Sequence, residues 1–168
     1  MRAEARRAVA AAAELLRETG AKDEALAVFE PARRRFGLTR PPRMRPLGRV
    51  WRLGVLLLDA DGGVRATGAI TRNTPPGHIR YAALSVEARR EVRAAANRGP
   101  FAAGETIDYD APPIELTADG IRGSGPLLLA EDGVRVRWSV SAPDEAARPL
   151  EPYLAERIEL LLHPPDGA

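Results

Sequence analysis

Two segments of the chain repeat one pattern, an apolar run followed by an acidic, glycine-containing turn and a second run. In the first, Arg49–Leu58 is followed by Asp59–Gly63 and then by Val64–Arg72, where apolar and polar residues alternate. Alternation places the two kinds of side chain on opposite faces of a strand, and an Asp/Gly segment between two such runs is typical of a hairpin turn. A second copy runs from Gly125 to Trp138. The pattern predicts two β-hairpins, which we expect to form one antiparallel sheet or a partial barrel.

Helical periodicity occupies the parts of the chain outside these hairpins. Apolar residues recur at helical spacing over residues 2–19, and Gly20 follows where a C-terminal cap is expected. Asp23 is a suitable N-cap for a second, shorter helix that ends at Pro31. Further helices are predicted at 85–98 and 151–163. The predicted fold class is α+β: an N-terminal helical pair, then an antiparallel sheet or partial barrel of about five to six strands with two packing helices.

Three prolines between residues 37 and 48 exclude a regular helix there and favour extended backbone. We therefore expect an N-terminal helical arm (1–36), a Pro/Arg-rich connector (37–48) and a main α+β body (49–168). A chain of 168 residues fits one domain overall.

Composition excludes several classes of site. The chain has no cysteine, so it has no disulfide, thiolate zinc site or cysteine nucleophile. Its longest wholly apolar run is far shorter than a membrane span, and its N-terminus lacks the apolar block of a secretion signal, so we expect a cytoplasmic protein. Neither His78 nor His163 has a neighbour at metal-ligand spacing. We expect no metal and no cofactor.

The strongest functional signal is charge. Residues 31–58 contain eight arginines and no acidic residue, whereas residues 100–168 contain five basic and 13 acidic residues. Guanidinium groups fork onto phosphates, and aromatic rings stack on bases. The predicted anion-binding residues are Arg33, Arg34, Arg35, Arg40, Arg43, Arg45, Arg49, Arg52 and Trp51, with Phe36 among them. The alternative is a solvated connector whose arginines pair with the acidic C-terminal third.

A second candidate is the run Asp108, Tyr109 and Asp110. Residues two apart on a strand share a face, so one hypothesis is that the two carboxylates bind a hard cation, or that one acts as an acid beside the other. The alternative is a solvent-exposed face next to a proline turn. The glycines around Ser124 match neither a phosphate-binding loop nor a nucleophile elbow, so we predict a hairpin connection there.

Residues Arg45–Leu58, with Ala66–Gly68 and Leu162–Pro165, resemble a group of small actinobacterial proteins, some of which carry the label glutaminase. The resemblance spans roughly residues 40–165 and implies a serine hydrolase that releases ammonia from glutamine. Serine glutaminases use a Ser-x-x-Lys motif; the one lysine here is Lys22, with Thr19 three residues before it.

Three hypotheses follow. The first is a non-catalytic binding module that contacts an anionic partner, RNA or a ribonucleoprotein or an acidic protein, through residues 33–52. The second is a small hydrolase of the glutaminase label. The third is a protein–protein adaptor that docks through the alanine-rich N-terminal helix.

Overall fold

The computed structural model describes residues 2–35, 37–74, 84–121, 125–139 and 142–165. It is a mixed α+β structure, as the sequence predicts, with four α-helices and several sheets among those residues. The longest sheet has the strand order β7-β8-β1-β4-β5-β6-β9.

The chain divides into two compact units, and neither is continuous in sequence. Unit 1 comprises Met1–Asp23, Val50–Thr67 and Ala111–Ala168, and unit 2 comprises Glu24–Arg49 and Gly68–Asp110. This division does not coincide with the expected boundaries at residues 36 and 48. The boundary between residues 49 and 50 falls inside one strand, β4 (Arg43–Leu53).

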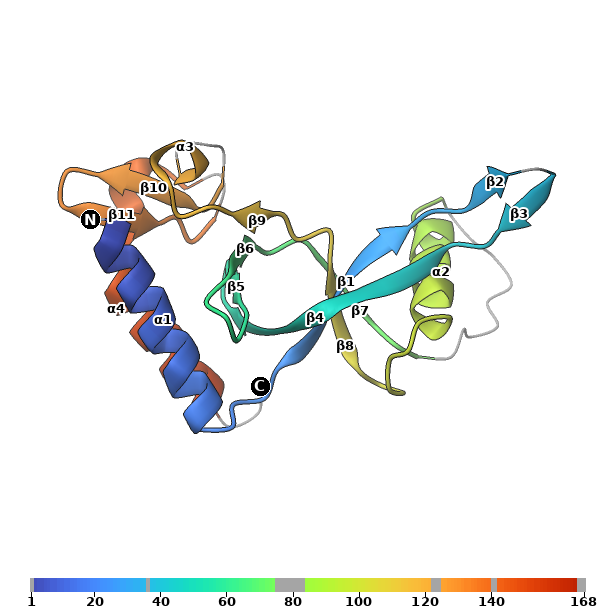
Figure 1. Cartoon of the computed structure of the whole chain (residues 1–168), viewed down its shortest axis with the longest axis horizontal. Coiled ribbons are helices and arrows are strands. Elements are labelled where there is room, and N and C mark those ends of the chain that lie inside the picture. Colours follow the sequence, from blue (N-terminus) through green and yellow to red (C-terminus); the bar gives the residue numbers. More distant parts are fainter. Residues whose placement is uncertain (1, 36, 75–83, 122–124, 140–141, 166–168) are drawn as a thin grey trace. The chain divides into compact units, whose positions relative to one another are not determined.

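Unit 1 is built on two helices, α1 (Arg2–Glu18) and α4 (Leu150–Leu162), which lie side by side (Figure 1). The buried face of α1 carries Ala5, Val9, Ala12, Ala13 and Leu16, and all of these except Ala13 belong to the apolar pattern that predicted this helix. Gly20 has a φ of 63°, which suits the residue after a helix end. Both helices are therefore core elements of unit 1.

The strands of unit 1 form two sheets. The end of β4 pairs with β5 (Leu56–Leu58), then β6 (Val64–Ala66) and β9 (Pro113–Ile114), all antiparallel. A separate three-stranded sheet contains β10 (Leu127–Ala130), β11 (Gly133–Val136) and β12 (Arg148–Pro149). The short helix α3 (Ala118–Ile121) precedes β10 in the chain, and the short helix η1 (Asp144–Ala146) lies between β11 and β12.

One buried tyrosine holds the turn between β4 and β5. The Tyr153 hydroxyl donates to the Leu53 carbonyl at 2.9 Å and accepts the Val55 N–H at 3.0 Å. Gly54, between them, has a φ of 65°, and a β-carbon there would collide with the Tyr153 hydroxyl. The turn thus needs glycine both for its backbone and for the approach of the ring.

Unit 2 is a sheet covered on one face by a helix. β1 (Glu24–Glu30) pairs in parallel with β8 (Thr106–Tyr109), and β8 pairs antiparallel with β7 (Ala69–Arg72). The helix α2 (Leu84–Asn97) buries Ala95 and Ala96 against Ala25 and Ala27 of β1 and Ile107 of β8. The beginning of β4 completes the sheet beside β1.

An antiparallel hairpin of β2 (Arg33–Arg35) and β3 (Leu38–Arg40) extends beyond this sheet (Figure 1). We call residues 31–42 the arm. The arm lies within what the sequence predicts as helical arm and connector, and its strands carry half of the arginines of the basic segment.

The predicted second helix of the N-terminal pair is wrong, because residues Glu24–Glu30 form strand β1. A short apolar run fits a helix or a strand equally well on periodicity alone. Pairing with β8 decides the outcome, and Ala25, Leu26 and Ala27 are all buried.

The predicted hairpins form, with three corrections. The strand predicted at Arg49–Leu58 is itself a hairpin, turning at Gly54, and the run Val64–Arg72 splits into β6 and β7. The two copies also do not share a sheet, since β5 and β6 belong to one sheet and β10 and β11 to another. The helices predicted at 2–19, 85–98 and 151–163 are confirmed. No helix in the described ranges is both long and apolar enough to cross a bilayer.

Tyr153→Phe is expected to lower the free energy of unfolding of unit 1 by about 1–3 kcal/mol, because the Leu53 carbonyl and the Val55 N–H both lose a partner. Urea denaturation followed by tryptophan fluorescence measures this, since Trp51 is buried in the same core. Leu160→Ala, at a position 42% exposed on the same helix, is the control and should change stability by no more than about 0.5 kcal/mol. Equal stability of Tyr153→Phe and the wild type would contradict the role of the hydroxyl.

Candidate anion-binding site

Four arginines from different elements of unit 2 line one pocket at the base of the arm. Its volume is about 460 Å³, and we call it the arm pocket; its lining residues are Glu30, Pro31, Arg33, Arg40, Pro41, Arg43 and Arg98. Four arginines and one glutamate leave a formal charge of +3. Strands β1 to β4 each supply one charged residue (Glu30, Arg33, Arg40 and Arg43), the two prolines lie in connections between strands, and Arg98 follows helix α2.

Two of these arginines face each other across the hairpin. Arg33 and Arg40 are directly opposed in the β2–β3 register, and both are exposed. Within the described part of the chain, neither side chain forms a hydrogen bond or an ion pair. Like charges directly opposed on a sheet are destabilising, so a bound anion would relieve their repulsion.

One carboxylate serves the next two arginines. Glu30 accepts a hydrogen bond from Arg43 Nε at 2.7 Å and one from Arg45 Nε at 2.9 Å. These two hydrogen bonds hold the pKa of Glu30 below its ordinary value, and the bond from Arg43 has the larger effect. Glu30 is therefore ionised at neutral pH. Glu30 therefore offsets part of the positive charge at the edge of the pocket.

Arg98 belongs to the site although it lies far from the arginine run in the sequence. Its Nη1 donates to the Pro42 carbonyl at 2.9 Å, which ties the end of α2 to the chain that leaves the arm. The sequence offered one signal, a basic residue at the end of a predicted helix, but helix-dipole pairing is sufficient to explain that position. The contact depends on tertiary packing and was not predicted.

The remaining predicted arginines have different surroundings. Arg34 is exposed opposite Thr39, and Arg49 forms an ion pair with Glu105. Arg52 is half-buried and interacts elsewhere in the chain. The Arg35 side chain and Phe36 lie outside the described residues. Three of the predicted eight arginines, Arg33, Arg40 and Arg43, thus line the pocket, together with Arg98.

Trp51 is a correction. The sequence places it among the anion-binding residues as a stacking surface, but it is only 7% exposed and belongs to the core of unit 1. Its indole N–H donates to the Ala21 carbonyl at 3.0 Å. On β4, Trp51 alternates with Arg52, so one side chain is buried where its neighbour reaches outward.

The acidic run at 108–110 does not form a pair on one face. Asp108 is fully buried on β8, whereas Asp110 is exposed just beyond the strand, with a φ of 53°. The left-handed backbone at Asp110 breaks the alternation on which the shared face depended. No group of three or more metal-ligating side chains occurs in the ranges that the structure describes.

The other candidates occupy structural positions or fall outside the structure. His163 ends α4 and contacts Glu159, with 3.0 Å between Nδ1 and Oε1. The Thr19 hydroxyl donates to the Leu15 carbonyl at 2.7 Å at the end of α1, beside the exposed Lys22. His78 and Ser124 lie outside the described residues. The glutaminase assignment stays a prediction.

The structure bears on the surface that the adaptor hypothesis needs for docking. The hypothesis relied on the apolar face of the N-terminal helix, and that face is buried in the core of unit 1 against α4. Removing residues 1–36 would therefore disrupt unit 1 rather than only detach a docking element.

Comparison of the chain with protein-family models, with curated proteins and with solved structures gives no significant match.

The pKa of the Glu30 carboxyl is expected to rise toward its ordinary value in an Arg43→Gln/Arg45→Gln variant, because both hydrogen-bond donors are replaced. A carboxyl-carbon NMR titration of both proteins measures the shift. The pKa of Glu30 is lower in the folded state than in the unfolded state. Glu30 therefore stabilises the fold at pH values above its unfolded-state pKa, and this contribution is lost as the pH falls through its folded-state pKa. Identical titration curves would contradict the pairing.

Trp51 fluorescence should resist quenching by acrylamide in a Trp138→Phe variant, because the remaining indole is buried. The matched variant Trp51→Phe retains Trp138, which is 61% exposed and should be quenched several-fold more strongly. Equally strong quenching of the two variants would mean that Trp51 is exposed to solvent and would contradict its place in the core.

Proposed function

We propose that this protein is a non-catalytic binding module that contacts single-stranded RNA through the arm pocket. The observation that carries the proposal is the opposed pair Arg33 and Arg40, which line one pocket together with Arg43 and Arg98. Among the described residues, Arg33 and Arg40 have no carboxylate partner. The arm pocket thus sharpens the sequence-based hypothesis from residues 33–52 to residues 30–43 and Arg98.

The lining of the pocket combines anion-binding groups with apolar surface. Four guanidinium groups from separate elements converge on a space of about 460 Å³, and each presents a planar fork of donors that matches phosphate oxygens. Pro31 and Pro41 add apolar surface beside them. A single strand of RNA supplies closely spaced phosphates together with sugars and bases that can lie on such surface.

Glu30 sets the strength of the interaction in this proposal. Its carboxylate accepts from Arg43 and Arg45, and therefore competes with any phosphate for the same donors. A neutral side chain at this position leaves both arginines available. Glu30 thus offers a variant whose effect is opposite in sign to that of removing arginines.

Arg33→Gln/Arg40→Gln is expected to weaken binding of a fluorescein-labelled 12-nucleotide oligouridylate by on the order of tenfold at low salt, with a salt slope shallower by about 1.4. Fluorescence anisotropy over a range of NaCl concentrations measures both quantities. The control Arg7→Gln/Arg90→Gln removes the same charge from α1 and α2, outside the pocket, and should retain wild-type affinity.

Glu30→Gln is expected to bind the same oligonucleotide several-fold more tightly than the wild type. Polyglutamate serves as the competitor in this assay and should displace the RNA poorly. The proposal would be overturned by any of three results. These are no measurable RNA binding, a loss of affinity in Arg7→Gln/Arg90→Gln as large as that in Arg33→Gln/Arg40→Gln, and displacement of the labelled RNA by polyglutamate as efficient as displacement by unlabelled oligouridylate.

A further inference from the structure

Unit 2 contains a second pocket, at the edge of the sheet where α2 crosses β7. Its volume is about 560 Å³, and we call it the β7–α2 pocket; its lining residues are Ile70, Thr71, Arg72, Thr74, Ala88, Arg89, Val92, Arg93, Thr106 and Tyr109. Volumes of this size are typical of small-molecule sites. None of these residues belongs to the arm pocket or to the predicted basic segment.

The walls of the β7–α2 pocket carry positive charge without compensation. Arg72 comes from β7, and Arg89 and Arg93 come from α2; no acidic residue of the described ranges lines the pocket. Among the described residues, none of the three guanidinium groups forms an ion pair or a hydrogen bond. The neighbouring Arg90, by contrast, lies near Glu87, with 4.0 Å between Nη1 and Oε2. Arg89 and Arg93 are four residues apart on one helix face, where like charges destabilise a helix.

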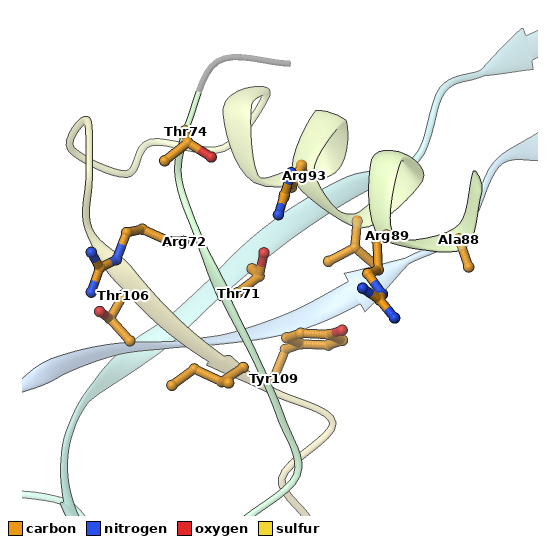
Figure 2. A pocket seen from close by; sticks show the side chains of 10 residues that line it. Thr71, Arg72, Thr74, Ala88, Arg89, Arg93, Thr106 and Tyr109 are labelled. Carbon is orange, nitrogen blue, oxygen red and sulfur yellow. The ribbon is translucent and has the colours of Figure 1, made fainter. Parts of the chain in front are cut away.

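The arginines alternate with hydroxyl groups and one aromatic ring. In Figure 2, Arg93 extends from α2 toward Thr71, and Arg89 extends toward the ring of Tyr109. Thr74 and Thr106 supply further hydroxyls around the opening. Burial, aided by the nearby Asp110 charge, raises the pKa of Tyr109, so its phenol remains a neutral donor at physiological pH.

One side of the pocket is apolar. Tyr109 and Val92 pack against the core of unit 2, and Ile70 is 53% exposed although it is a large apolar side chain. A ring of the ligand could lie on this surface while an anionic group reaches the arginines. The pocket therefore offers an apolar surface for one part of a ligand and arginines for an anionic part of the same ligand.

Two asparagines fix the walls of the pocket relative to each other. Asn97 Nδ2 donates to the Thr74 carbonyl at 2.8 Å, and Asn73 Nδ2 donates to the carbonyls of Phe101 at 2.8 Å and Ala102 at 3.1 Å. These bonds tie the end of α2 and the following loop to the end of β7. The segments that carry the arginines of the two walls are thus joined to each other before any ligand binds.

We propose that the β7–α2 pocket is a binding site for a nucleoside monophosphate. The phosphate accepts from Arg72, Arg89 and Arg93, and the base lies against Tyr109, Val92 and Ile70. The site is separate from the arm pocket, so it does not depend on RNA binding by the arm.

Isothermal titration calorimetry of the full chain with AMP tests the proposal. AMP should bind with a micromolar to low-millimolar dissociation constant, and Arg89→Gln/Arg93→Gln should weaken it at least tenfold. Arg72→Gln should weaken it several-fold from the opposite wall, and it provides a second test if the helix variant unfolds. Arg90→Gln, on the same helix but outside the pocket, is the matched control.

Ribose 5-phosphate and adenosine separate the two parts of the ligand, and each should bind at least several-fold more weakly than AMP. Arg33→Gln/Arg40→Gln should leave AMP binding unchanged, which distinguishes this site from the arm pocket. No AMP binding by the folded wild type, an equal loss in Arg90→Gln, or ribose 5-phosphate binding as tight as AMP binding would overturn the proposal.

Discussion

Packing of alanine against alanine between α2 and β1 is the contact on which both pockets of unit 2 depend. Ala25 and Ala27 on the strand and Ala95 and Ala96 on the helix are at most 2% exposed. Their short side chains let the helix lie close to the sheet, and interiors packed in this way tolerate little displacement. Beyond the helix, Gly99 lies so near Met44 of β4 that a β-carbon would come within 2.9 Å of its carbonyl oxygen. Helix α2 is therefore held in place, and with it the arginines at 89, 93 and 98.

This packing also explains which parts of the molecule were predictable from sequence. Helices α1, α2 and α4 follow from local periodicity and caps, and the hairpin turns follow from Asp and Gly, because the deciding interactions are close in the chain. Strand β1 was missed because its partner β8 lies about 80 residues away. The arm arginines were predicted because they are contiguous.

The β7–α2 pocket was missed for the same reason as β1. Pairing of β7 with β8 brings Arg72 and Tyr109 to one region, and α2 adds Arg89 and Arg93 from a third segment. No pattern of spacing in the sequence predicts that these residues line one pocket. Trp51 shows the converse: its neighbours in sequence are basic, but strand alternation points its ring into the core of unit 1.

Division of the chain into units changes the meaning of its charge. Unit 1 has 12 basic and 16 acidic residues, and unit 2 has 13 basic and seven acidic residues, giving formal charges of −4 and +6. A general preference for arginine would enrich both units, but the nearly equal basic counts fall on units of unequal size, with 99 residues in unit 1 and 69 in unit 2. Unit 2 is therefore both richer in basic residues and poorer in acidic residues than unit 1. In unit 1, Arg135 and Arg137 pair with Asp132 and Asp144; in unit 2, the arginines around both pockets mostly lack such partners among the described residues. Because acids placed beside them would stabilise the folded chain by removing like-charge repulsion, their scarcity around two pockets favours binding of an anion from outside the chain over a merely solvated surface.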